Sequence, residues 1–223
     1  MWGARRSATI ADMSWAREQV ARDYDRVAAA YAARFSGELE HKPLDRGWLD
    51  ELAGALAGRG PVCDLGCGPG HVTRHLADRG VDAFGLDLSP GMVEVARQAH
   101  PALRFEVGDM LAMPLADGSL AGVVALYSLI HLRRADVPRA AAEIHRVLQP
   151  GGWLLAAVHG GDGEVHADEF LGAPISVDAT LFQPDELAGF LLDGGLRVHQ
   201  VVTRPPYQVE YPTPRIYVRA SRP

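Results

Sequence analysis

The feature that most constrains the fold is an apolar segment that ends in three closely spaced glycines. Residues 62–71 read Val-Cys-Asp-Leu-Gly-Cys-Gly-Pro-Gly-His. The residues before Gly66 are strand-like, and a helical pattern follows Gly70. Glycine lets the backbone approach a ligand where a Cβ would collide. We therefore predict a strand, a tight turn and a helix, with Gly66, Gly68 and Gly70 at a ligand site.

Strand-like and helical segments alternate beyond this turn. Such alternation predicts an α/β fold with a mainly parallel sheet and helices on both faces. The expected helices begin after Gly70, Ser89, Val137 and Pro184. The expected strands are residues 62–65, 83–86, 103–107, 122–127 and 153–158.

The last third of the chain departs from this alternation. Residues 160–184 show little periodicity, so we predict a long irregular insertion, a kind of loop that is often functional. Two strand-like segments follow, residues 197–203 and 215–220. The Pro-rich link between them is too short for a crossover helix, which predicts an antiparallel pair.

The N-terminal part is predicted to be helical. Residues 15–35 carry apolar side chains at helical spacing, and residues 44–56 form a second helical stretch. With 223 residues, 48% of them hydrophobic, the chain is long enough for one domain with one core. We divide it into helices over 15–57, a core over 61–158, an insertion over 159–184 and a C-terminal part over 185–223.

Composition disfavours several classes of function. The formal charge of −6, with no cluster of basic residues, disfavours a nucleic-acid partner. The most apolar stretch, residues 120–132, is too short to cross a bilayer. Residues 1–14 contain Arg5 and Arg6 without an apolar run behind them, so we expect no export signal and a cytoplasmic location.

No metal site is predicted. Cys63 and Cys67 lack a second Cys or His pair at zinc-site spacing, so we interpret them as reduced structural thiols. His71 and His75 have i, i+4 spacing, but no third ligand accompanies them. We interpret this pair as a coincidence of one helix face.

A carboxylate ends the second expected strand. Asp87 stands seventeen residues beyond Gly70, where a carboxylate can accept hydrogen bonds from both hydroxyls of a ribose. Alone, Asp87 would also suit a nicotinamide cofactor. Met92, on the following helix, either packs against an adenine or belongs to the core.

Four segments in this order carry a family resemblance. They are the glycine turn at 62–71, the strand end at 85–92, Phe-Glu-Val-Gly-Asp-Met at 105–110 with its continuation to 120, and residues 123–132 followed by 143–152. The order resembles that of class I S-adenosylmethionine (SAM)-dependent methyltransferases, and most closely the group that includes ubiquinone and menaquinone biosynthesis. The resemblance is close over residues 61–158.

The resemblance implies a Rossmann-like, doubly wound sheet of seven strands in the order 3-2-1-4-5-7-6, with strand 7 antiparallel and N-terminal lid helices. It implies SAM as cofactor, with Asp64 near its amino group, the glycine turn around its methionine half, and Asp109 on its adenine amino group. The expected cofactor contacts are Asp64, Gly66, Gly68, Gly70, Asp87, Leu88, Met92, Asp109, Met110, Tyr127, Tyr24 and Tyr31.

The acceptor is less constrained than the cofactor. We expect a small molecule, first an aromatic or heteroaromatic secondary metabolite, methylated by in-line displacement. His131 and His159 follow the fourth and fifth strands and are the first choices for a base if the acceptor must lose a proton. Tyr24 and Tyr31 belong either to the core or to a lid over SAM. An NAD(P)-dependent oxidoreductase and a non-catalytic SAM-binding module are the alternatives.

Overall fold

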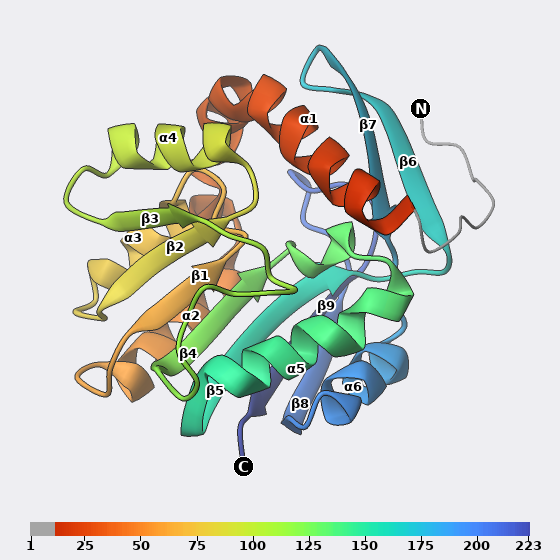
Figure 1. Ribbon diagram of the computed structural model, residues 1–223. Helices are drawn as coiled ribbons and strands as arrows, with labels where there is room; N and C mark the ends of the chain where they lie inside the picture. The colour runs from red at the N-terminus through yellow and green to blue at the C-terminus, as the bar shows by residue number, and fades with distance from the viewer. Residues whose placement is uncertain (1–11) are drawn as a thin grey trace.

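A seven-stranded sheet forms the centre of the computed structural model, which describes residues 12–223 (Figure 1). Residues 1–11, and with them most of the segment on which the export-signal expectation rests, lie outside this range. The sheet order is β3-β2-β1-β4-β5-β9-β8. Its strands are β1 (Val62–Leu65), β2 (Ala83–Asp87), β3 (Arg104–Val107), β4 (Leu120–Leu126), β5 (Leu148–His159), β8 (Arg197–Arg204) and β9 (Arg215–Ser221).

The predicted topology is confirmed. Strands β1 to β5 pair in parallel, whereas β9 pairs antiparallel with both β5 and β8. Strands β9 and β8 are thus the seventh and sixth strands of the expected order. The predicted strand β5 was too short, because it begins at Leu148 rather than at Trp153.

Helices cover both faces of this sheet (Figure 1). Alternate residues of a strand point to opposite faces, so Val123 packs toward α5 and α6 while Val124 packs toward α2 and α3. Helix α2 lies close to the sheet, because a Cβ on Gly122 would meet Leu56 at 2.4 Å. The helices are α1 (Asp12–Phe35), α2 (Pro43–Leu56), α3 (His71–Ala77), α4 (Pro90–Ala99), α5 (Val137–Val147) and α6 (Pro184–Asp193), with 3-10 turns η1 (Glu38–His41), η2 (Leu129–His131) and η3 (Arg134–Asp136).

The prediction of an irregular insertion over 160–184 was wrong. Strands β6 (Glu164–Phe170) and β7 (Ala173–Thr180) form a separate antiparallel hairpin that stands beside α1 (Figure 1). Its two-residue turn is Leu171-Gly172, with φ of 52° and 79°, the left-handed conformation that such tight hairpins need. A register shift between Ala167 and Glu169 breaks the period-two pattern, which hides the strand from sequence analysis.

The described helices include none that is long and apolar enough to cross a membrane.

Candidate cofactor and acceptor site

The glycine turn leaves the carboxyl end of β1 and leads into α3. The backbone N–H of Gly66 donates to the Leu86 carbonyl at 2.7 Å, which holds the turn against the end of β2. Gly68 has a φ of 51°, and a Cβ there would face Tyr31 at 3.7 Å across an otherwise open space. At Gly70 a Cβ would meet the Phe105 ring at 2.6 Å. Gly70 is therefore required for packing of the turn against β3, whereas Gly68 faces a cavity.

That cavity, of about 100 Å³, lies at the carboxyl ends of β1, β2 and β4 and beneath α1. Three of the predicted site residues do not line it: Asp64, Gly70 and His159. The others do, and they are Gly66, Gly68, Asp87, Leu88, Met92, Asp109, Met110, Tyr127, Tyr24, Tyr31 and His131. One edge of the sheet thus collects residues that are more than 100 positions apart.

Asp87 is held in place by backbone donors. Its two oxygens accept hydrogen bonds from the N–H groups of Gly68 at 2.8 Å and Ser89 at 2.9 Å. Burial raises the pKa of this carboxyl above its ordinary value. Each carboxylate oxygen can accept a further bond, so the group is oriented and still able to receive a ligand hydroxyl.

Asp64 lies behind the turn rather than in the cavity. Its carboxylate is buried and accepts a hydrogen bond from the Thr73 hydroxyl at 2.7 Å, which ties β1 to α3. Burial raises the pKa of Asp64 to about 6. An ammonium or hydroxyl group near this side chain would have favourable electrostatics.

Asp109 serves both a turn and the cavity wall. One oxygen accepts from the Leu111 N–H at 2.9 Å, and the other pairs with the Arg17 guanidinium at 2.8 Å. Arg17 comes from α1, so this ion pair joins the helix to the rim of the cavity. Sequence reasoning missed Arg17, because it lies outside the apolar stripe of its helix.

Met92 is completely buried and also lines the cavity, so both interpretations offered for it hold geometrically.

A second cavity, of about 590 Å³, adjoins the first. Its walls come from α1, the 37–42 segment, the β6–β7 hairpin and the loop before β9. Its lining is largely apolar on the hairpin side, where Val165, Ile175 and Val177 face it, together with Phe170. Four residues line both cavities: Tyr24, Tyr31, Tyr127 and His131.

The two predicted histidines lie in different surroundings. His131 bonds the Tyr24 hydroxyl through Nε2 at 2.8 Å and the Asp178 carbonyl through Nδ1 at 3.2 Å. His159 lines only the larger cavity, and its Nδ1 bonds the Thr213 hydroxyl at 2.7 Å. Burial lowers both pKa values, that of His159 to about 3 with a contribution from the Arg215 charge. Both imidazoles are therefore neutral near pH 7.

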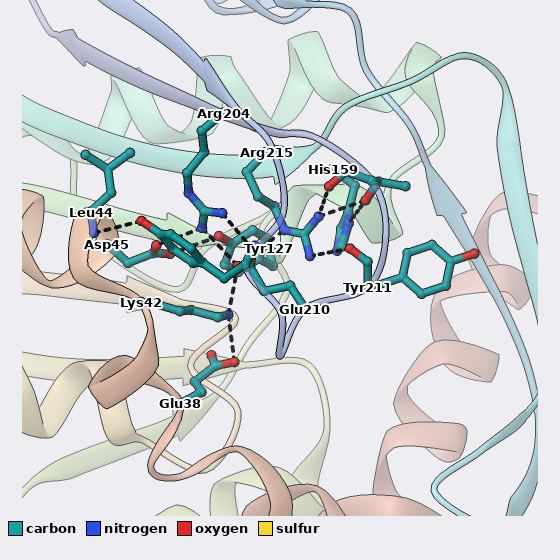
Figure 2. A network of polar contacts seen from close by, with 12 residues as sticks. Glu38, Lys42, Leu44, Asp45, Tyr127, His159, Arg204, Glu210, Tyr211 and Arg215 are labelled. Atoms are coloured by element: carbon teal, nitrogen blue, oxygen red, sulfur yellow. Dashed lines mark hydrogen bonds and ion pairs between the residues drawn. The ribbon is translucent and has the colours of Figure 1, made fainter.

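A buried polar network closes the far side of the larger cavity (Figure 2). Asp45 of α2 accepts hydrogen bonds from the hydroxyls of Tyr127 at 2.9 Å and Tyr217 at 2.7 Å. The Arg204 guanidinium pairs with Asp45 at 3.1 Å and with both oxygens of Glu210. Sequence reasoning singled out Tyr127 but missed Asp45, Tyr217, Arg204 and Glu210, because they come from separate segments that carry no local motif.

The Tyr127 hydroxyl therefore points into this network, and the residue lines both cavities. Burial, followed by the Asp45 charge, raises the pKa of Tyr127 well above its usual range. Tyr127 has a φ of 58°, a strained conformation for a tyrosine. Strain maintained by a buried network at the end of β4 marks this position as part of a site.

The two histidines interpreted as a coincidence of one helix face each bond a different carboxylate. His71 bonds Glu38 at 3.1 Å and His75 bonds Asp50 at 2.8 Å. Cys63 and Cys67 are buried free thiols. Across the part of the chain that the structure describes, there is no group of three His, Cys, Asp or Glu residues able to hold a metal ion.

Comparisons with known proteins agree with this geometry. A family described as methyltransferase domain matches residues 62–152. The malonyl-[acyl-carrier protein] O-methyltransferase of Serratia marcescens is 35% identical over 123 residues, 49% of this chain and 48% of that protein. The demethylmenaquinone methyltransferase of Renibacterium salmoninarum is 33% identical over 144 residues, 63% of this chain and 58% of that protein. The matched part thus spans about half the length of these relatives.

Solved structures extend the likeness to most of the chain. The putative methyltransferase solved in complex with the Haloferax volcanii Trm112 activator has a TM-score of 0.67 and 26% identity, covering 92% of this chain and 97% of that one. The [4+2]-cyclase SpnF has a TM-score of 0.71 at 16% identity, covering 93% and 96%. The second likeness shows the fold alone.

The fold and the motifs together define a class I, Rossmann-like methyltransferase architecture. Over residues 62–152 the chain is similar to the SAM-dependent methyltransferases, the family that its sequence motifs resemble. SAM is the cofactor of that family, as the order of the four motifs predicted.

Proposed function

We propose that this protein transfers the methyl group of SAM to a small-molecule acceptor. The observation that carries the proposal is the boundary between the two cavities. One cavity is lined by the glycine turn and Asp87, the other is largely apolar, and Tyr24, Tyr31, Tyr127 and His131 belong to both. A cofactor in the first and an acceptor in the second would meet at these four residues.

The smaller cavity is assigned to SAM. In this proposal Asp87 binds the ribose, Asp109 and Met110 bind the adenine, Leu88 and Met92 pack beside it, and the turn at Gly66 and Gly68 receives the methionine half. Asp64 would act from behind the turn, through its charge. Gly70 would shape the turn without touching the ligand.

Helix α1 is assigned the role of a lid. A cavity of about 100 Å³ is far below the roughly 300–1,000 Å³ of typical ligand pockets, whereas the larger cavity falls within that range. In this proposal α1 moves away from the sheet to admit SAM and returns over the bound cofactor. The contacts to be broken and remade are the Arg17–Asp109 ion pair and the bonds of Asp25 to Ser89 and Gly91.

The acceptor assigned to the larger cavity is an apolar, aromatic or heteroaromatic molecule. Phe170 of the hairpin contacts Tyr31 and Phe35 of α1, so an aromatic wall lies along one side. The acceptors named for the relatives, malonyl-[acyl-carrier protein] and demethylmenaquinone, differ from one another. The lining of this chain, rather than those names, supports the proposed class.

In this proposal the protein contributes to the reaction mainly by positioning the two reactants. Bound SAM supplies an electrophilic methyl group, and the enzyme holds the acceptor in line with it in a site closed to water. In this proposal the closed lid and the hairpin exclude solvent from the boundary once cofactor and acceptor are bound. The neutral His131 and His159 are the available bases.

Calorimetric titration tests the cofactor, and product analysis tests the reaction. We expect binding of SAM and of S-adenosylhomocysteine, and none of NAD or NADP. Release of S-adenosylhomocysteine with methylation of an added aromatic acceptor would support an enzyme over a non-catalytic SAM-binding module. Binding of NAD in place of SAM would overturn the proposal.

A further inference from the structure

We propose that Tyr24 and His131 form a proton relay at the boundary of the two cavities, and that the acceptor is a neutral hydroxyl compound, such as a phenol, that must lose its proton. This inference rests on the proposed function. It adds the partner of the base and the ionisation state of the acceptor.

Hydrogen-bond chemistry determines the tautomer of His131. The Asp178 carbonyl oxygen can only accept, so the proton must lie on Nδ1, 3.2 Å away. Nε2 then carries a lone pair and accepts from the Tyr24 hydroxyl at 2.8 Å. The two groups are therefore a directed pair, with the phenol as donor and the imidazole as acceptor.

Tyr24 is the member of the pair that can touch an acceptor. Its ring is half-buried and lines both cavities, while both nitrogens of His131 are engaged. Of the other boundary residues, Tyr127 directs its hydroxyl to Asp45, and Tyr31 packs against the Tyr24 ring in a T-shaped contact. The Tyr24 oxygen is thus the polar group best placed to receive a proton from a reacting atom.

The reaction balances without another reagent. The acceptor oxygen forms a bond to the methyl carbon as the bond from that carbon to the sulfonium sulfur breaks. The acceptor proton passes to the Tyr24 oxygen, and the Tyr24 proton passes to Nε2 of His131. The products are the methyl ether, S-adenosylhomocysteine and an imidazolium, so the positive charge of the sulfonium ends on His131.

Three Arg and Lys side chains line the larger cavity, and two of them, Lys42 and Arg215, are held by partners within the protein, which argues against an anionic acceptor that would need no base. The third, Arg34, is exposed and packs over the Phe35 ring. Lys42 pairs with Glu38 at 2.7 Å. Arg215 donates to the Thr213 hydroxyl at 2.8 Å and to the Tyr211 carbonyl at 3.1 Å. Both positive charges lie beside the Tyr127 ring, at 4.6 Å and 5.6 Å from its centroid, and both are engaged by partners within the protein.

The surroundings of His131 keep its imidazole neutral. The titratable groups facing it are Tyr24 from α1, Asp178 from β7 and His159 from β5. Burial lowers the pKa of His131, an effect that the nearby Asp178 opposes. The base is therefore in its active form across the neutral range.

The test uses 2-naphthol and 2-naphthoate as matched acceptors. We expect SAM-dependent methylation of the naphthol and much less of the carboxylate. Tyr24→Phe and His131→Ala should each lower kcat about 100-fold or more, the scale of general base catalysis, with the SAM dissociation constant changed less than about threefold. In wild type the rate should reach a plateau above the pKa of His131, whereas in His131→Ala it should continue to rise with pH as naphthol ionises.

A proton inventory in mixtures of H₂O and D₂O separates a relay from a structural contact. If two protons move in the transition state, the plot of rate against D₂O fraction should be curved in wild type and straight in Tyr24→Phe. Tyr31→Phe, the matched variant about two helical turns further along α1, should keep the curvature whatever its rate. Melting curves for each variant establish that it is folded, and nitrogen NMR of His131 should show the Nδ1–H tautomer in wild type.

The outcomes distinguish this inference from the proposed function. Absence of SAM binding would overturn the proposed function itself. Binding of SAM with an unchanged kcat and pH profile in folded Tyr24→Phe would overturn the relay alone. Faster methylation of naphthoate than of naphthol, or methylation of neither, would overturn the acceptor class.

Discussion

The cofactor side and the acceptor side of the site are built in opposite ways. On the cofactor side, the carboxyl ends of β1 to β4 and the short segments after them supply most of the walls of a small cavity beneath α1, and backbone N–H groups orient the key carboxylate, Asp87. On the acceptor side, a cavity nearly six times larger is enclosed by α1, the hairpin and the loop before β9, and it rests on a buried ionic network.

This difference indicates which side of the site tolerates changes of sequence. Cofactor contacts depend on the sheet, so they persist as long as the parallel strands pair. Acceptor contacts depend on how peripheral elements dock, and these elements can be exchanged without disturbing the sheet. This physical separation explains how relatives with different named acceptors share the motifs of residues 62–152.

The largest effect is expected when the centre of the buried network on the acceptor side is removed. Asp45→Ala leaves the Arg204 charge and two tyrosine hydroxyls without their shared partner, which should lower the free energy of unfolding by about 3–5 kcal/mol. Urea unfolding measures this loss. Glu51→Ala on the same helix breaks an exposed pair with Arg219 and should cost less than about 1 kcal/mol. Equal losses in the two variants would contradict the importance of the network.

Asp64 gives a pH-dependent test of the cofactor side. Its pKa is raised by burial to about 6, from 3.8 for an unperturbed aspartate. Between these values the unfolded chain releases a proton that the folded protein keeps, so stability falls as pH rises through this window and levels off above it. Because asparagine cannot ionise, the stability advantage of Asp64→Asn over wild type should grow by a few kcal/mol from pH 4 to 7.

Repeating the same experiment with saturating SAM tests whether Asp64 lies near the cofactor. If the SAM ammonium lies near Asp64, its charge lowers the pKa of the carboxyl, and the gap between wild type and Asp64→Asn should shrink. Urea unfolding at each pH, with and without SAM, measures both gaps. If SAM leaves the stability difference between wild type and Asp64→Asn unchanged, Asp64 does not interact with the ligand and is only a structural partner of Thr73.

Asp87→Ala should weaken SAM binding by about 1.5–3 kcal/mol, the scale of hydrogen bonds to a charged acceptor, and leave the fold intact. Calorimetry measures the affinity and circular dichroism the fold. Asp82→Ala, an exposed position just before the same strand, is the matched control and should bind SAM normally. Wild-type affinity in Asp87→Ala would remove the ribose assignment.

The smallest expected effect concerns the lid. Amide hydrogen exchange over residues 17–35 should slow several-fold when S-adenosylhomocysteine binds, because the ligand stabilises the closed position of α1. Residues 137–147 of α5, on the sheet face away from the lid contacts, serve as the internal reference. Exchange that slows equally in both helices would indicate global stabilisation rather than lid closure.

Most of the fold and the cofactor side were predictable because their signals are local. Apolar strand-like segments, with glycines at the turns between elements, located β1 to β5. The short Pro-rich link predicted the antiparallel pair of β8 and β9. The hairpin was missed because its bulge breaks the alternation between Ala167 and Glu169. The network was missed because Asp45 and Arg204 are 159 residues apart.

The sequence by itself determined that a glycine turn and a carboxylate end adjacent parallel strands, because parallel pairing brings the carboxyl ends of β1 and β2 to one edge. Only the tertiary structure decided that the His131 imidazole contacts the Tyr24 hydroxyl. Tyr24 and His131 are 107 positions apart, and only the docking of α1 over the end of β4 brings them within hydrogen-bond distance. Such docking depends on burial of apolar surface, which has no direction along the chain and leaves no local pattern.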